Sequence, residues 1–137
     1  MANALYPLWK QELEKGTANA ALTGTVKAAL VDTGTYTYSA AHQFYSDLSG
    51  VTGTPSPAGG MTTKTYTAGV FNADPVTFTA VTGPSIEAIV IYIDTGAAGT
   101  SPLVAYLDTG ITGLPVTPNG GDIVVSWDAG AYKIFSL

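Results

Sequence analysis

The chain has 137 residues with no cysteine and no arginine, 11% of its residues are charged, and its formal net charge is −5. This length corresponds to one domain with its own core, and the lack of cysteine excludes disulfides and cysteine-based zinc sites. Nucleic-acid binding needs clustered Lys and Arg to neutralise phosphates. The five lysines without arginine therefore argue against a DNA or RNA partner.

Hydropathy argues against a membrane partner. The longest strongly apolar stretch, 88–93, is far shorter than the roughly 20 residues of a membrane-spanning helix, and the N-terminus lacks the basic and apolar regions of a signal peptide. We therefore expect a protein that is made in the cytoplasm and stays out of membranes. A hydrophobic fraction of 46% with so few charges indicates a surface that contacts other protein, because soluble domains usually carry about a quarter charged residues.

The first segment predicts the one clear helix of the chain. Pro7 suits a first helical turn, and Gly16 suits the left-handed residue that ends a helix. The apolar residues that share one face at helical spacing are Leu5, Leu8, Trp9 and Leu13. We therefore divide the chain into an N-terminal helical arm, residues 1–20, and a β-sandwich domain, residues 21–137.

The apolar face of this arm has two possible partners. Such stripes usually pack on the core of their own domain, but the arm could also dock on a neighbouring subunit. Binding energy is usually concentrated in a few aromatic anchors and the apolar residues beside them. The candidate partner-binding residues are therefore Leu5, Tyr6, Leu8 and Trp9.

Beyond Gly16 the sequence becomes a series of short β-runs separated by Gly and Pro. The strands predicted from alternation and β-propensity are 25–32, 36–38, 64–71, 76–81, 86–94, 103–108, 122–127 and 132–135. The run 86–94 is the most apolar, so we expect it at the centre of a sheet. Between the runs we expect a helical turn within 40–48 and loops at 49–60 and 110–121.

Regularly spaced short strands of this kind are typical of sandwiches, jelly rolls and small barrels. The sequence therefore predicts an all-β fold, a jelly-roll-like β-sandwich of about eight short strands with one N-terminal amphipathic helix.

The tripeptide Asp-Thr-Gly occurs three times, at 32–34, 94–96 and 108–110. With Ala97, the second copy has the active-site signature of aspartic peptidases, in which two carboxylates share one proton. However, all three copies follow predicted strands. Asp can bond the backbone two residues on, and Gly can take a positive φ. We therefore favour turn formation over catalysis.

Metal and cofactor chemistry has little support in the sequence. His42 is the only histidine, which excludes a histidine-based metal cluster, and we expect it to be partly buried and hydrogen-bonded. A calcium ion needs six to eight oxygens. The aspartates Asp94, Asp108 and Asp122 lie at successive strand ends, which alternate between the two poles of an antiparallel sheet, so at most some of them can converge on one ion. We expect no catalytic residues, no metal and no cofactor.

Several segments together resemble small virion proteins of tailed bacteriophages. They are MANALYP with Trp9-Lys10, LTGTVKAALVDT at 22–33, HQFYSDL at 42–48, and the closing runs 121–128 and 133–135. The chain is most similar to the jelly-roll cement, or decoration, proteins of short-tailed phages. The resemblance implies a non-enzymatic protein on the capsid exterior that binds the major capsid protein near symmetry axes. It also implies a homodimer or homotrimer that bridges capsomers against the pressure of packaged DNA.

Other interpretations stay open at this point. The chain could be a structural protein elsewhere on the virion, in the tail, neck or fibre base. A glycan-binding jelly roll is a further alternative, and its candidate stacking aromatics are Trp127, Tyr106 and Tyr132, which are also ordinary core or cross-strand residues. The peptidase is the last alternative.

Overall fold

A five-stranded antiparallel sheet lies at the centre of the computed structural model, which describes residues 3–137. Its strand order is β1-β7-β6-β2-β3. These strands are β1 (Ala4–Leu5), β2 (Val26–Val31), β3 (Val51–Ser56), β6 (Ala88–Ile93) and β7 (Leu103–Leu107). The described part of the chain is therefore mostly β, with one short helix, as the sequence predicts.

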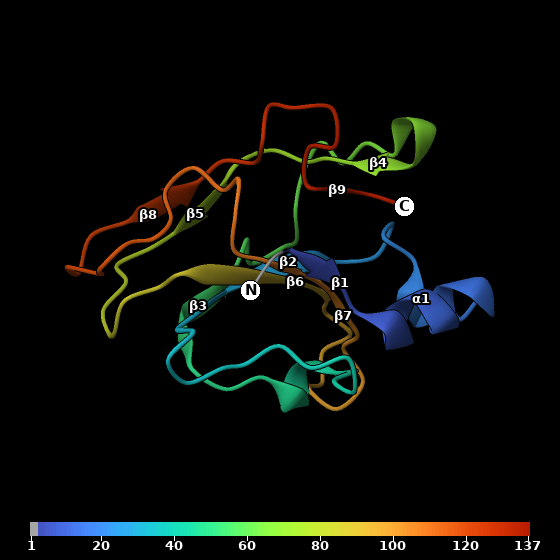
Figure 1. Cartoon of the computed structure of the whole chain (residues 1–137), viewed down its shortest axis with the longest axis horizontal. Helices are drawn as coiled ribbons and strands as arrows, with labels where there is room; N and C mark the ends of the chain where they lie inside the picture. Colours follow the sequence, from blue (N-terminus) through green and yellow to red (C-terminus); the bar gives the residue numbers. More distant parts are fainter. Residues whose placement is uncertain (1–2) are drawn as a thin grey trace.

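Two small sheets lie on one side of the central sheet, and the segment 33–50 lies on the other (Figure 1). The small sheets pair β4 (Val70–Phe71) with β9 (Phe135–Ser136), and β5 (Val76–Phe78) with β8 (Ile123–Val125). Both faces of the central sheet are thus covered, and the buried side chains form one continuous core.

Strand β6 is central, as its apolar sequence predicts. All six of its residues are buried, because successive side chains point to opposite faces of a sheet and both faces are covered here. The β2–β6 ladder runs without a break from Val26↔Ile93 to Val31↔Ala88. An uninterrupted apolar run is the pattern expected for a strand buried on both faces.

The prediction of a loop over 49–60 is wrong, because β3 runs through it. This strand pairs with β2 in the register Leu30↔Thr52, with a bulge between Ala28 and Leu30. It is an edge strand, where a proline can turn its missing N–H away from the ladder. Gly53 has a φ of 71°, a conformation that glycine adopts without strain. An edge position therefore accommodates a Gly/Pro sequence that a central strand could not.

Four other sequence predictions assign more regular structure than the chain has. Residues 36–38 form no strand; they lie in the covering segment 33–50, and Tyr36 buries its ring there. The helical turn expected within 40–48 is only the 3-10 helix η2 (Tyr45–Asp47). The run 64–71 is reduced to β4, after the 3-10 helix η3 (Thr67–Gly69), and 132–135 is reduced to the start of β9.

Helix α1 spans Pro7–Glu14, with Pro7 in its first turn. Gly16 follows with a φ of 74°, so both predicted ends are confirmed. The 3-10 helix η1 (Ala18–Ala20) then leads into the sheet. Within residues 3–137, no helix is long and apolar enough to cross a membrane.

The same substitution at a central and a peripheral valine tests this arrangement. Val90 in β6 is fully buried and Val124 in β8 is 53% exposed. Val90→Ala removes two buried carbons and leaves a cavity, so it should lower the free energy of unfolding by about 2 kcal/mol. Val124→Ala should change it by less than about 0.5 kcal/mol. Urea denaturation measures both, and equal effects would contradict the central position of β6.

Candidate partner-binding surface

The N-terminal segment is attached to its own domain through Tyr6 and Trp9, both fully buried. The Tyr6 N–H donates to the Val104 carbonyl (3.0 Å), which continues the pairing of β1 with β7. The Trp9 indole donates to the Ala20 carbonyl (2.9 Å), and its ring meets Phe135 edge-on at 5.9 Å. The sequence left open whether this segment packs on its own domain or on a neighbour. In the structure it packs on its own domain, and these two candidate residues present no surface to a partner.

Leu5 lies in an open groove of about 470 Å³ between β1 and the C-terminal segment. β1 is the outermost strand on its side of the central sheet and forms one wall with Asn3. Residues 132–136 form the other wall, and Tyr132, on that wall, is 69% exposed. We call this space the β1 groove.

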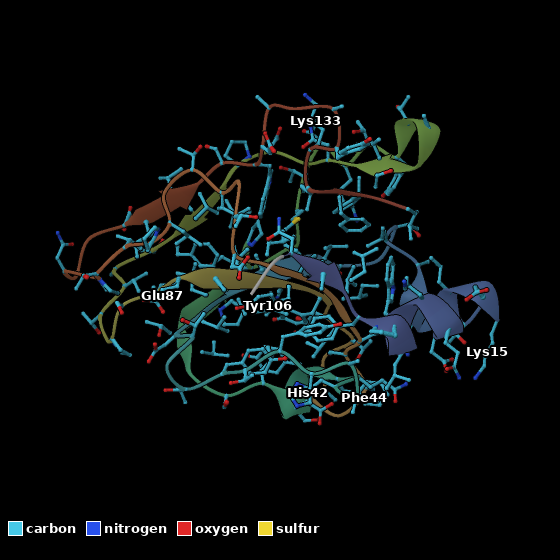
Figure 2. The ribbon with its side chains drawn as sticks, viewed as in Figure 1. Lys15, His42, Phe44, Glu87, Tyr106 and Lys133 are labelled. Carbon is cyan, nitrogen blue, oxygen red and sulfur yellow. The ribbon has the colours of Figure 1, made fainter. Side chains whose placement is uncertain are left out.

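Leu8 lies in a second, more apolar groove of about 250 Å³, which we call the α1 groove. Helix α1 and the turn at 17–20 line one part of it. Phe44 and Pro102 line another and are bridged to each other. Figure 2 shows Phe44 in the layer that covers the central sheet on the side of segment 33–50. The four sequence candidates therefore divide between the β1 groove (Leu5), the α1 groove (Leu8) and the core (Tyr6, Trp9).

Sequence reasoning did not find the opposite walls of the two grooves. Phe44, Pro102 and residues 132–136 are far from α1 in the chain, and nothing in their local pattern indicates a groove. Three further apolar side chains are exposed without having been singled out: Tyr66, Val124 and Leu137.

The three aromatics proposed for glycan stacking do not lie together on the surface. Tyr106 is 3% exposed, and its ring lies tilted against that of the partly buried Tyr38, with ring centroids 5.8 Å apart. Trp127 is 9% exposed, and its indole donates to the Asp74 carbonyl (3.0 Å). Only Tyr132 offers a free ring face, so these residues form no stacking platform.

The sequence predicts turns at all three Asp-Thr-Gly copies, and hydrogen bonds confirm this for the copies at 32–34 and 94–96. The Asp32 carboxylate accepts the Gly34 N–H (2.9 Å), and the Asp94 carboxylate accepts the Gly96 N–H (2.8 Å). The two aspartates follow opposite ends of the antiparallel β2–β6 ladder. Within one chain they therefore cannot share a proton as a peptidase dyad does. In residues 3–137, no group of three or more His, Asp or Glu side chains is arranged to hold a metal ion.

Asp94 also forms an ion pair with Lys27 across the β2–β6 ladder. The Lys27 Nζ lies 2.7 Å from an Asp94 oxygen, and the two side chains are 16% and 26% exposed. The pKa of Asp94 is lowered, first by the Lys27 hydrogen bond and then by the Gly96 N–H. The pair therefore favours the ionised carboxylate in the folded state.

His42 is half-buried and hydrogen-bonded, as the sequence predicts. Its Nδ1 lies 2.8 Å from the Tyr36 hydroxyl, which in turn lies 2.7 Å from the Tyr6 hydroxyl. Burial raises the pKa of both tyrosines above the usual value, so both hydroxyls keep their protons at neutral pH.

Truncation of Trp9 tests the attachment of the N-terminal segment to its own domain. Trp9→Ala should lower the free energy of unfolding by about 3–5 kcal/mol, because a large buried ring and its hydrogen bond are lost. The matched aromatic control, Tyr132→Ala, should cost less than about 0.5 kcal/mol. Equal losses in urea denaturation would mean that Trp9 is not buried in the isolated chain.

The Lys27–Asp94 pair predicts a specific pH dependence. A carboxyl with a lowered folded-state pKa adds stability above its unfolded-state pKa, and this stability disappears as the pH falls through the folded-state pKa. Between about pH 5 and about pH 2, Asp94→Asn should therefore lose less stability than the wild-type chain. Glu14→Gln, at an exposed position on α1, is the control and should follow the wild type. The same response in both variants of a pH series of urea denaturations would contradict the pairing.

Comparison with known proteins identifies no family for this chain: no protein-family model matches it and no curated protein matches its sequence.

Proposed function

We propose that this protein is a structural component of a tailed-phage virion that binds the outer capsid surface and bridges neighbouring capsomers. Its partner is the major capsid protein, and it acts without catalysis, cofactor, nucleic acid or membrane. The protein is made in the host cytoplasm and ends on the exterior of the shell. The observation that carries this proposal is a charge-poor chain with two open grooves beside its N-terminal segment.

The composition of the chain suits permanent contact with other protein. With 11% charged residues and a neutral fraction rich in Thr, Ala and Gly, little charge has to be desolvated when the surface is covered. Four of the five lysines already contact other groups of the chain. Lys15 pairs with Glu12 and Lys27 with Asp94, whereas Lys64 and Lys133 donate to main-chain carbonyls. Such a surface binds by shape and apolar contact more than by charge.

The two grooves supply anchoring points of different kinds. In the α1 groove, Leu8 is partly exposed next to Phe44, so an apolar side chain of the capsid can pack there. In the β1 groove, Leu5 and the outer edge of β1 can receive an extended segment of a second copy of this chain as an added strand. Each contact can be weak, because many copies bind one lattice and several contacts act together.

The strand arrangement supports a jelly-roll-like sandwich as the finer description of the fold. β2 pairs with β3 on one side and with β6, which is far away in the sequence, on the other. Pairs of strands that are joined by such long connections occur in Greek-key and jelly-roll folds. The two edges of the central sheet differ. β3 carries Pro55, which protects an edge from pairing, so we propose β1 as the edge used in a homodimer or homotrimer.

Co-sedimentation with expanded phage shells that lack their decoration protein tests this function. The wild-type chain should bind to saturation at a copy number that matches an icosahedral lattice, and it should raise the melting temperature of the shell. The affinity of Leu8→Ala for the shell should be lower by a factor of about five or more, since loss of an anchoring contact costs about 1 kcal/mol or more.

The control is Val124→Ala, which removes the same kind of exposed aliphatic surface from β8 and should bind like the wild type. The thermal unfolding of both variants is measured first, so that a loss of binding is not a loss of fold. Absence of wild-type binding to expanded shells contradicts the proposal. Binding to tails alone would assign the chain to another part of the virion.

A further inference from the structure

Three side chains from separate parts of the protein are joined in series by hydrogen bonds. Tyr6 directly precedes α1, Tyr36 follows β2, and His42 lies in the segment 33–50 that covers the central sheet. The two hydroxyls are 2.7 Å apart, and the Tyr36 hydroxyl is 2.8 Å from His42 Nδ1. Figure 2 shows His42 in the covering layer. These contacts tie the covering segment to the N-terminal segment.

The number of hydrogens determines which form of His42 fits. Two hydrogen bonds contain two hydrogens, and the hydroxyls of Tyr6 and Tyr36 supply one each. His42 Nδ1 must then be the acceptor, which selects the neutral tautomer with its hydrogen on Nε2. In this form the hydroxyl hydrogens of Tyr6 and Tyr36 both have an acceptor.

A proton added to His42 brings a third hydrogen to these two hydrogen bonds, which contain only two. Tyr6 is 0% and Tyr36 2% exposed, so both side chains are buried. Neither has another hydrogen-bond partner among residues 3–137, and the nearby Tyr38 hydroxyl donates to the Leu5 carbonyl. One buried hydrogen is therefore left without an acceptor, which is costly because the group has lost its water.

One neighbouring group attracts a protonated His42 and so opposes this cost. The titratable side chains next to His42 are Tyr36 and Asp47, and those next to Tyr36 are Tyr6, Tyr38 and Tyr106. Only Asp47 attracts a protonated imidazole. Asp47 is exposed, so water screens this attraction, whereas nothing screens the buried hydroxyls.

We propose that the Tyr6–Tyr36–His42 chain is an acid-sensitive latch, which holds residues 36–42 against the central sheet and releases them when His42 is protonated. Release stops at residue 43, because the next residues are held by backbone bonds that do not involve His42. The Gln43 carbonyl accepts the Leu103 N–H (2.8 Å), and the Tyr45 N–H donates to the Ser101 carbonyl (2.8 Å). This latch does not depend on what the protein binds.

Hydrogen exchange of the full chain, followed by mass spectrometry and corrected for intrinsic exchange rates, tests the latch. Between about pH 7.5 and about pH 5, where histidine changes charge, protection of residues 36–42 should fall by at least about tenfold. Residues 43–46 and β6 should keep their protection. Unchanged protection of 36–42, or an equal fall in β6, overturns the proposal.

Two variants separate the latch from general acid sensitivity. His42→Asn keeps an acceptor near the Nδ1 position and cannot titrate, so residues 36–42 should stay protected at both pH values. Tyr36→Phe removes the middle hydroxyl, so protection there should be low at both. A wild-type pH response in His42→Asn overturns the proposal.

A measurement on the unaltered protein complements the variants. Nitrogen chemical shifts of the His42 ring should report the neutral Nε2–H tautomer at about pH 7.5. The Nδ1–H tautomer would overturn the proposal even if no variant folds.

Discussion

The pairing of β6 with β2 and β7 is the constraint on which the rest of the structure depends. Every residue of β6 is buried, and its side chains alternate between the two faces of the sheet, so both faces need a cover. The small sheets β4–β9 and β5–β8 cover one face, and the segment 33–50 covers the other (Figure 1). The second cover has little regular structure and is held by tyrosine side chains, such as Tyr45, whose ring packs at a tilt against Tyr92 with ring centroids 4.7 Å apart. The surfaces open to a partner therefore lie at the margins of the central sheet.

Much of this fold could be predicted from local patterns. The apolar run 86–94 indicates its own central position, Pro7 and Gly16 mark the ends of α1, and Asp followed two residues later by Gly marks turns. The failures concern segments whose structure depends on distant partners. β3 is a strand only because the edge of β2 is available to it, and Tyr36 lies in a cover because an exposed sheet face needs one. Neither condition is visible within the segment itself.

Only one wall of each groove could be predicted from the sequence. Helical spacing identified Leu5, Leu8 and Trp9, and the β1 and α1 grooves do adjoin these residues. The same spacing does not distinguish a side chain that fills the core, such as Trp9, from one at the rim, such as Leu8. The opposite walls come from residues 132–136 and from Phe44 with Pro102, which only the fold brings close. The position of a groove thus follows from topology, whereas its anchor residues follow from sequence.

Cryo-electron microscopy of expanded shells saturated with the protein tests the central claim most directly. We expect extra density outside the shell, over the boundaries between capsomers, with the α1 groove turned toward the capsid surface. Shells without added density, or density confined to the tail, would contradict it.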